Sequence, residues 1–129
     1  MTCKSAGVLI KSRGHYLLCK RSFEMKNFSG MWSVPSGHID KGENARSAAI
    51  RELYEETRIC LTKNDLQLID KQNGFALYYH ESPYMYYPVL DIEHIGYCYF
   101  DNMEIRNLSA NSIDQHLRKI ILDKKSILS

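Results

Sequence analysis

A dense pattern of charged and small residues between Gly37 and Ile59 constrains this chain more than any other feature. The stretch reads Gly-x5-Glu-x7-Arg-Glu-Leu-x-Glu-Glu-x-Arg-Ile. Its carboxylates Glu52, Glu55 and Glu56 are three and four residues apart, a spacing that places them on one face of an α-helix. Like charges at this spacing repel one another, so folding alone does not favour them. A hard cation such as Mg²⁺ does favour clustered carboxylate oxygens, and the pattern therefore predicts a metal-binding helix.

The pattern resembles the signature of the Nudix hydrolases, which cleave nucleoside diphosphates linked to another group. The chain departs from that signature at Arg58, where glycine is usual, and at Ser36, since the family has Pro-Gly-Gly where this chain has Pro-Ser-Gly. Helices often end in a left-handed residue, a conformation that costs residues other than glycine about 1 kcal/mol. We therefore expect either a strained left-handed residue at Arg58 or a helix that ends in another conformation. The matching positions are Gly37, Glu43, Arg51, Glu52, Leu53, Glu55, Glu56 and Ile59.

The resemblance implies a role for each carboxylate of the predicted helix. Glu55 and Glu56, together with the main-chain carbonyl of Ser36, are the implied ligands of Mg²⁺, for which Mn²⁺ substitutes. A carbonyl serves as a ligand whatever its side chain, so the change at Ser36 is mild. Glu52 is implied either to orient or deprotonate the attacking water or to bind the metal itself, since family members differ on which residue is the base.

Two arginines are further candidates. Arg51 is expected to orient the catalytic carboxylates rather than contact substrate, because its planar guanidinium can hold Glu43 or Glu55 in a bidentate pair. Arg21 follows the second predicted strand, where relatives often place an arginine that contacts phosphate. The competing interpretation of Arg21 is an ordinary surface arginine.

Tyrosines and acidic residues beyond the helix supply the remaining candidates. A tyrosine can stack on a nucleobase, which contributes about 1–3 kcal/mol, or pack in the core; Tyr79 is our choice for substrate binding. Many family members use one more acidic metal ligand, and we choose Glu93 because it closely precedes a predicted strand. The tyrosines considered are Tyr78, Tyr79, Tyr84, Tyr86 and Tyr87, and the acidic residues are Asp91, Glu93 and Glu104.

Composition limits the partners and the compartment. A length of 129 residues suits a single domain spanning 1–129. A net charge of +2 gives no large basic field, so nonspecific binding to long nucleic acid is not predicted. The four cysteines lack Cys-x-x-Cys spacing, which argues against a zinc site. No apolar run approaches the roughly 18 residues of a membrane span, and no leader opens the chain, so we expect a cytoplasmic protein.

The order of predicted elements gives the fold class. Strands are expected at 6–10, 16–19, 31–34, 66–69, 75–79 and 95–100, with a flexible turn after Pro35 and a loop over 80–91. One helix is expected from 43 or 44 to about 57, with Ile50, Leu53, Tyr54 and Thr57 on its apolar face. A second helix is expected to begin at the capping box Ser112-x-x-Gln115. It would bury Ile113, Leu117, Ile120 and Ile121. This order predicts an α/β/α sandwich with a mixed sheet, which the Nudix resemblance also implies.

The predicted function is metal-dependent hydrolysis of a pyrophosphate linkage in a nucleoside diphosphate-type substrate, with water attacking phosphorus. The expected partner is a small nucleotide, and a capped or triphosphorylated RNA end is also compatible with this chemistry. One alternative is a noncatalytic module that binds nucleotides or RNA ends, although such a module would be expected to lack some of the carboxylates. A second alternative is an acidic interaction domain that binds no metal.

Overall fold

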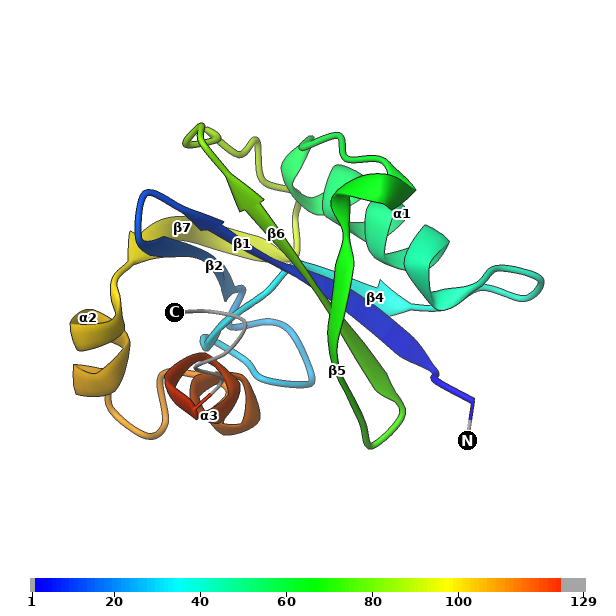
Figure 1. Cartoon of the computed structure of the whole chain (residues 1–129). Coiled ribbons are helices and arrows are strands. Elements are labelled where there is room, and N and C mark those ends of the chain that lie inside the picture. Colours follow the sequence, from blue (N-terminus) through cyan, green and yellow to red (C-terminus); the bar gives the residue numbers. More distant parts are fainter. Residues whose placement is uncertain (1, 124–129) are drawn as a thin grey trace.

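A seven-stranded mixed sheet runs through the computed structural model, which describes residues 2–123 (Figure 1). Its strands are β1 (Ser5–Ser12), β2 (His15–Arg21), β3 (Trp32–Ser33), β4 (Ser36–His38), β5 (Gln67–Gln72), β6 (Phe75–Ser82) and β7 (His94–Phe100). The helices are α1 (Ala45–Thr57), the short 3₁₀ helix η1 (Lys63–Asp65), α2 (Asn102–Asn107) and α3 (Gln115–Asp123). No helix in the described part of the chain is both long enough and apolar enough to cross a membrane.

Strand β1 lies at the centre of the sheet. It pairs in parallel with β6 along its whole length, while its other edge is divided between β4, which pairs antiparallel with Ser5–Gly7, and β2, which pairs antiparallel with Ile10–Ser12. Strands β3 and β7 both pair with β2, and β5 pairs with β6. The sheet therefore splits between β2 and β4. The connection from β3, which pairs with β2, to β4, which pairs with β1, crosses this split.

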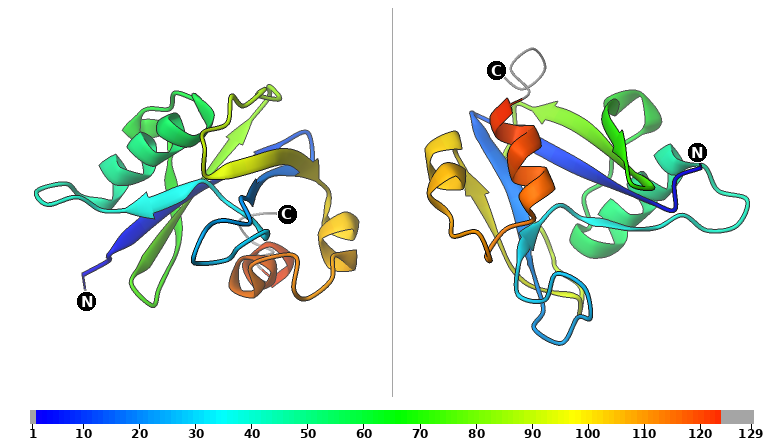
Figure 2. Two further views of the ribbon diagram at one scale, coloured as in Figure 1. Left: turned by 180° about the vertical axis from the view of Figure 1, so that it is seen from behind. Right: turned by 90° about the horizontal axis from the view of Figure 1, so that it is seen from below.

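Helices cover both faces of the sheet, with α1 on one side and α2 and α3 on the other (Figure 2). Side chains of β1 alternate between the two cores, so that Val8 and Ile10 pack with α1 residues while Leu9 packs with α3 residues. A strand segment buried on both faces has no solvent side, which explains why residues 6–10 of β1 carry no polar side chain. The predicted α/β/α sandwich with a mixed sheet is therefore confirmed.

Several boundaries differ from the predictions because tertiary pairing overrides local pattern. The predicted flexible turn at Ser36 is strand β4, since β1 supplies hydrogen-bond partners there. Strand β6 continues to Ser82, into the predicted loop, because β1 pairs with it as far as Ser12. The prediction that Tyr54 packs in the core was also wrong: it is 42% exposed, and the cationic group of Arg58 lies over its ring. Helices η1 and α2 were not predicted.

The predicted capping box at Ser112 and Gln115 was wrong as well. Ser112 donates its hydroxyl to the carbonyl of Ser109, and Gln115 donates its side-chain amide to the carbonyl of Ala110. Asp114 caps the helix instead, because its Oδ1 accepts from the backbone N–H groups of the first helical turn. The four apolar residues assigned to this segment, Ile113, Leu117, Ile120 and Ile121, are all buried as predicted.

Candidate active site

Helix α1 is held at both ends by specific backbone contacts. The side chain of Asn44 accepts a hydrogen bond from the backbone N–H of Ser47 at 2.8 Å, which fixes the first turn. At the other end, Arg58 has φ = 65° and its N–H donates to the carbonyl of Tyr54 at 2.8 Å. This is the left-handed helix end that the sequence predicts, with arginine where glycine has no steric penalty.

Arg51 connects the acidic residues around the start of α1. Its guanidinium forms a bidentate pair with Glu43, with both N···O distances 2.9 Å, and it also lies 2.9 Å from Glu52 and 3.2 Å from Glu55. The hydrogen bonds from Arg51, together with one from the backbone N–H of Asp40, lower the pKa of Glu43 to about 2. Arg51 therefore favours the charged form of Glu43 and contacts the carboxylates of Glu52 and Glu55 as well.

Glu56 differs from the other glutamates because it is buried, with 1% of its surface exposed. Its Oε1 accepts a hydrogen bond from the backbone N–H of Ser36 at 3.2 Å, whereas Oε2 is buried without a hydrogen-bond partner among the described residues. Burial, together with the neighbouring carboxylate of Glu52, raises the pKa of Glu56 to about 10. A buried carboxylate oxygen with no donor matches the requirement of a divalent cation, so these residues fit a metal ion.

The contact between β4 and α1 depends on two glycines. A Cβ on Gly37 would overlap the carboxylate of Glu52, and one on Gly7 would stand 2.7 Å from Cβ of Ser36. Glycine at both positions lets β1, β4 and α1 approach closely enough for Ser36 to reach Glu56. Gly37 therefore has a use beyond an ordinary turn, since it makes room for a carboxylate.

A histidine that the sequence analysis overlooked lies behind Glu56. The side chain of His94 is 1% exposed, with Nε2 3.6 Å from Oε1 of Glu56 and Nδ1 2.9 Å from Oδ1 of Asp91. No spacing pattern in the sequence distinguishes this histidine from the others. Its position one residue after Glu93, at the start of β7, is the only clue that the sequence offers.

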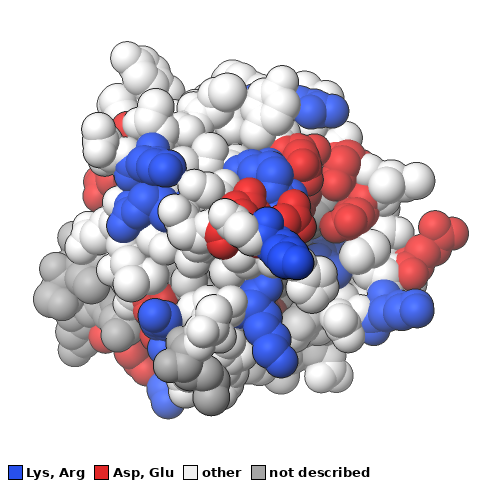
Figure 3. All heavy atoms as spheres, turned by 90° about the vertical axis from the view of Figure 1, so that its right-hand side faces the viewer, with Lys and Arg blue, Asp and Glu red and all other residues white. Residues whose placement is uncertain are grey.

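A cleft of about 870 Å³ opens beside these glutamates and extends to the start of α3. Four of the predicted site residues line it: Ser36 and Glu52, together with Arg21 and Glu93 from β2 and the segment before β7. Acidic side chains gather on the side of the molecule that carries α1 and β4, with basic side chains beside them (Figure 3). The other lining residues include Lys26, Asn27, Phe28, His38, Phe75, Asp114 and His116.

Other predicted residues lie away from this cleft. Tyr79 is 5% exposed, packs in the core that α3 covers and donates its hydroxyl to Glu81 at 2.9 Å, so its ring offers no free face to a nucleobase. Of the acidic alternatives to Glu93, Asp91 is engaged with His94, and Glu104 belongs to the capping box of α2. Glu55, with a half-exposed side chain, lies at the surface within reach of Arg51.

Within residues 2–123, one trio of potential metal ligands already has its donor atoms within 4.8 Å of one another: His15, Asp101 and Glu104. These residues lie at the opposite end of β2 from Arg21, and the two carboxylates serve as the capping box of α2. The glutamates of α1 do not converge in this way, because Arg51 holds Glu52 and Glu55 while Glu56 turns inward.

The fold and the cleft together define an α/β/α protein with an acidic helix beside a cleft that also carries basic side chains. The family model of the NUDIX domain matches residues 1–118, and the chain belongs to this family. The resemblance drawn from the motif between Gly37 and Ile59 is therefore confirmed.

Known relatives and solved structures agree with this assignment. Nucleoside triphosphatase NudI of Klebsiella pneumoniae is 44% identical over 48 residues, which cover 37% of this chain and 34% of that protein. RNA pyrophosphohydrolase of Erythrobacter litoralis is 41% identical over 54 residues, or 42% of this chain and 32% of that protein. The chain thus matches about a third of the length of these curated relatives.

Two solved structures share the fold over nearly the whole chain. The MutT protein from Methanosarcina mazei Go1 has a TM-score of 0.75 at 22% identity, with 95% of this chain and 94% of that chain covered. The dihydroneopterin triphosphate pyrophosphohydrolase of E. coli has a TM-score of 0.72 at 21% identity, and both chains are covered completely.

Proposed function

We propose that this chain is a hydrolase that cleaves a pyrophosphate linkage in a nucleotide-type substrate and depends on Mg²⁺ or Mn²⁺. The observation that carries the proposal is Glu56, a buried carboxylate whose Oε2 has no donor among the described residues, beside a cleft large enough for a nucleotide. Glu52 and Glu55 lie on the same helix as Glu56, and like charges at this spacing repel one another, so folding alone would disfavour them.

The ligand set follows from the residues that surround Glu56. Glu55, Glu56 and the main-chain carbonyl of Ser36 would hold the metal ion, with Glu52 as a further ligand or as the base. Glu93, which also lines the cleft, would be an additional acidic ligand. When bound, the ion neutralises phosphate oxygens and lowers the pKa of a bound water. The hydrogen bonds from Arg51 keep Glu52 and Glu55 oriented before substrate arrives.

The chain's own residues account for the rest of the reaction. Arg21 and Lys26 line the cleft and supply positive charge to the phosphates. Glu52 orients the attacking water or accepts its proton, as the water oxygen bonds to one phosphorus and the bridging P–O bond breaks. The leaving phosphate takes the bonding electrons, so the products are a nucleoside monophosphate and either pyrophosphate or the other phosphorylated group. No covalent enzyme intermediate is needed.

A substrate panel tests the proposal. Nucleoside triphosphates, dinucleoside polyphosphates, nucleotide sugars, ADP-ribose and triphosphorylated RNA would be incubated with the protein and Mg²⁺, and the products separated by chromatography. At least one should be cleaved at a pyrophosphate linkage. Relatives named as a nucleoside triphosphatase and as RNA pyrophosphohydrolases make the first and last classes the first to test.

A variant links turnover to the glutamates of α1. Glu56→Gln keeps the size of the side chain and removes its charge, so turnover should fall by at least about 10²-fold, the scale expected for one strong electrostatic contributor. The control is Glu81→Gln, because Glu81 is an exposed glutamate of β6 outside the cleft lining. Binding of substrates without cleavage of any would instead identify a noncatalytic binding module.

A further inference from the structure

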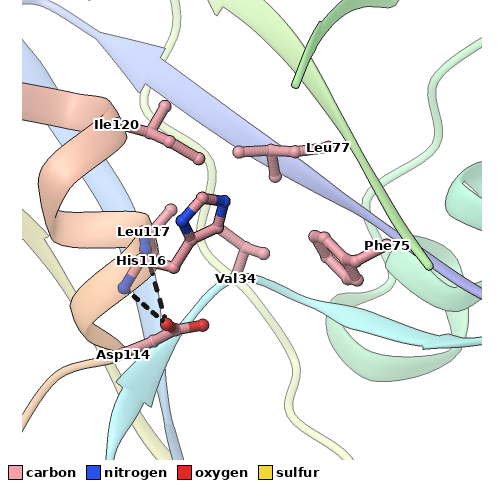
Figure 4. Close-up of a pocket in the computed structure, with 7 residues that line it drawn as sticks. All are labelled: Val34, Phe75, Leu77, Asp114, His116, Leu117 and Ile120. Carbon is pink, nitrogen blue, oxygen red and sulfur yellow. Dashed lines mark hydrogen bonds between the residues drawn. The ribbon is translucent and has the colours of Figure 1, made fainter. Parts of the chain in front are cut away.

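Within residues 2–123, two histidines contact an aspartate, and they differ in burial. His116 has its Nε2 2.9 Å from Oδ2 of Asp70, beside a small cavity of about 30 Å³ at the start of α3 (Figure 4), and its side chain is 41% exposed. His94 has its Nδ1 2.9 Å from Oδ1 of Asp91, and its side chain is 1% exposed. Burying a polar ring costs free energy unless partners compensate. A histidine as deeply buried as His94 is therefore held by specific partners, and one of them is Glu56 of the candidate active site.

A β-bulge turns His94 toward α1. Side chains alternate along a strand, and Cys98 and Phe100 of β7 pack on the face of the sheet that α3 covers. Strict alternation would direct residue 94 to that face as well. Two successive residues of β2 pair with residues 96 and 94 of β7, however, so β7 has one extra residue at this point and its alternation is reversed. Bulges often re-aim a side chain beside an active site, and this one directs His94 to the helix that carries the glutamates.

Asp91 fixes both the ring of His94 and the segment before β7. Its Oδ1 lies 2.9 Å from Nδ1 of His94 and accepts the backbone N–H of Glu93 at 3.2 Å. Because a carboxylate accepts, Nδ1 carries a proton, and Nε2 is the ring nitrogen that faces Glu56. One oxygen of Asp91 thus sets the orientation of the imidazole and the backbone position of Glu93, the additional acidic ligand proposed above.

The two carboxylate oxygens of Glu56 have different surroundings. Oε1 accepts from the backbone N–H of Ser36 at 3.2 Å and lies 3.6 Å from Nε2 of His94, whereas Oε2 is buried without a hydrogen-bond partner among the described residues. The contact with Nε2 is longer than a formed hydrogen bond. It is attractive when the two atoms share one proton, whichever of them carries it, since the other then offers a lone pair. Ser36 and His94 therefore engage Oε1 and leave Oε2 to a cation.

We propose that His94 is a positioning residue for the metal site. Backed by Asp91, it keeps Oε2 of Glu56 directed at the cation and joins the segment that carries Glu93 to α1. The inference rests on the proposed function, in which Glu56 binds the metal ion. Residues that orient metal ligands from behind contribute about 10- to 100-fold to metal affinity. His94 acts in this way through Glu56, without contacting the substrate itself.

Two substitutions separate the contacts of His94. The amide nitrogen of asparagine takes the place of Nδ1, so His94→Asn keeps a donor for Asp91 and loses the group beside Glu56. The longer side chain of glutamine brings its amide to the place of Nε2, so His94→Gln keeps a polar group beside Glu56 and loses the donor for Asp91. The pair therefore tests whether the contact with Glu56 matters for the metal.

Calorimetric titration of the full chain with Mn²⁺ alone measures the effect, and the relevant site is the one whose binding is lost in Glu56→Gln. His94→Asn should bind Mn²⁺ at least about tenfold more weakly than the wild type, and His94→Gln at most about threefold more weakly. The matched control is His80→Asn, because Nδ1 of His80 lies 2.9 Å from the backbone carbonyl of Asp65 and His80 is outside the cleft lining. The control should bind Mn²⁺ as the wild type does.

Turnover distinguishes positioning from a role in folding alone. In His94→Asn, the Mg²⁺ concentration that gives half-maximal turnover should rise at least about tenfold, while KM for the substrate at saturating Mg²⁺ stays within about threefold of the wild type. A smaller folded fraction would lower the apparent kcat and shift neither constant. Wild-type affinity for Mn²⁺ in His94→Asn, or equal losses in His94→Asn and His94→Gln, would overturn the inference.

Asp91 supplies a second test, which decides the outcome if His94→Asn does not fold. Asp91→Ala removes the acceptor that orients the ring and should weaken Mn²⁺ binding at least about tenfold, whereas Asp91→Asn keeps an acceptor oxygen and should weaken it at most about threefold. Unchanged affinity in Asp91→Ala would overturn the inference. The two proposals also fail in different ways. No Mn²⁺ binding by the wild type would overturn both, whereas unchanged Mn²⁺ affinity and turnover in His94→Asn would overturn this inference alone.

Discussion

The carboxylate of Glu52 occupies the space that a side chain on Gly37 would require. Gly37 does not have a left-handed backbone, so its small size rather than its conformational freedom matters here. The two residues belong to β4 and α1, and their contact fixes how close the helix comes to the strand that carries Ser36.

Gly37→Ala should therefore impair turnover more than stability. The added methyl group would push away the end of a flexible side chain, so the free energy of unfolding should change by less than about 1 kcal/mol. Moving the Glu52 carboxylate by about 1 Å should lower kcat at least about tenfold. The control is Gly96→Ala, since a Cβ there meets no atom within 4 Å. Equal kcat in both variants would show that the position of Glu52 does not matter.

Arg51→Lys tests whether the planar guanidinium orients the carboxylates. Lysine keeps the charge but cannot hold Glu43 in a bidentate pair while contacting Glu52 and Glu55, so kcat should fall at least about tenfold. Arg46→Lys is the matched control on the same helix. Arg46 donates to the carbonyls of Lys63 and Leu66, so its replacement should lower the denaturation midpoint and leave kcat unchanged. A similar loss of kcat in both variants would contradict an orienting role for Arg51.

The features that could be predicted from the sequence are those governed by local rules. The proximity of Glu52, Glu55 and Glu56 on α1 follows from their spacing and from helix geometry. The left-handed residue at Arg58 follows from the rule for helix ends. The layered fold follows from the order of apolar segments. These properties depend on neighbours within a few residues or on a pattern that spans a whole element.

Features that depend on contacts between distant segments could not be predicted. Glu56 is buried and Glu55 exposed because β4 packs against one side of α1, and helix periodicity does not show which side. Tyr79 and Tyr78 point to opposite faces of β6, so an aromatic cluster in the sequence does not show which ring faces a cleft. Asp114 was missed because Ser112 offers a competing local cap.

The helix end at Arg58 gives a prediction about stability. Its φ of 65° costs an arginine about 1 kcal/mol relative to glycine, whereas its guanidinium gains about 0.5–1 kcal/mol by lying over the ring of Tyr54. Arg58→Gly removes both effects and should change the free energy of unfolding by only a few tenths of a kcal/mol. Arg58→Ala loses the ring contact and keeps the strain, so it should be less stable than Arg58→Gly by about 1 kcal/mol. Denaturant midpoints measure the difference, and equal midpoints would contradict the strain.

The raised pKa of Glu56 predicts how stability depends on pH in the metal-free protein. The carboxyl binds its proton more tightly in the folded chain, where its pKa is about 10, than at its ordinary pKa of 4.5. Its contribution to stability is therefore complete below about pH 4.5 and is lost as the pH rises toward 10. In EDTA, the free energy of unfolding should fall more steeply from pH 5 to pH 9 in the wild type than in Glu56→Gln. Parallel curves would show that Glu56 does not hold a proton in the folded state.

The central claim is that the glutamates of α1 act through a divalent cation. The most direct test is turnover of a cleaved substrate by chelator-treated protein during a Mg²⁺ titration, with Mn²⁺ in a parallel series. Turnover should be absent in excess EDTA and should return as free Mg²⁺ rises, because Glu55, Glu56 and Ser36 need a cation to bind the phosphates. Full turnover in excess EDTA would contradict the account.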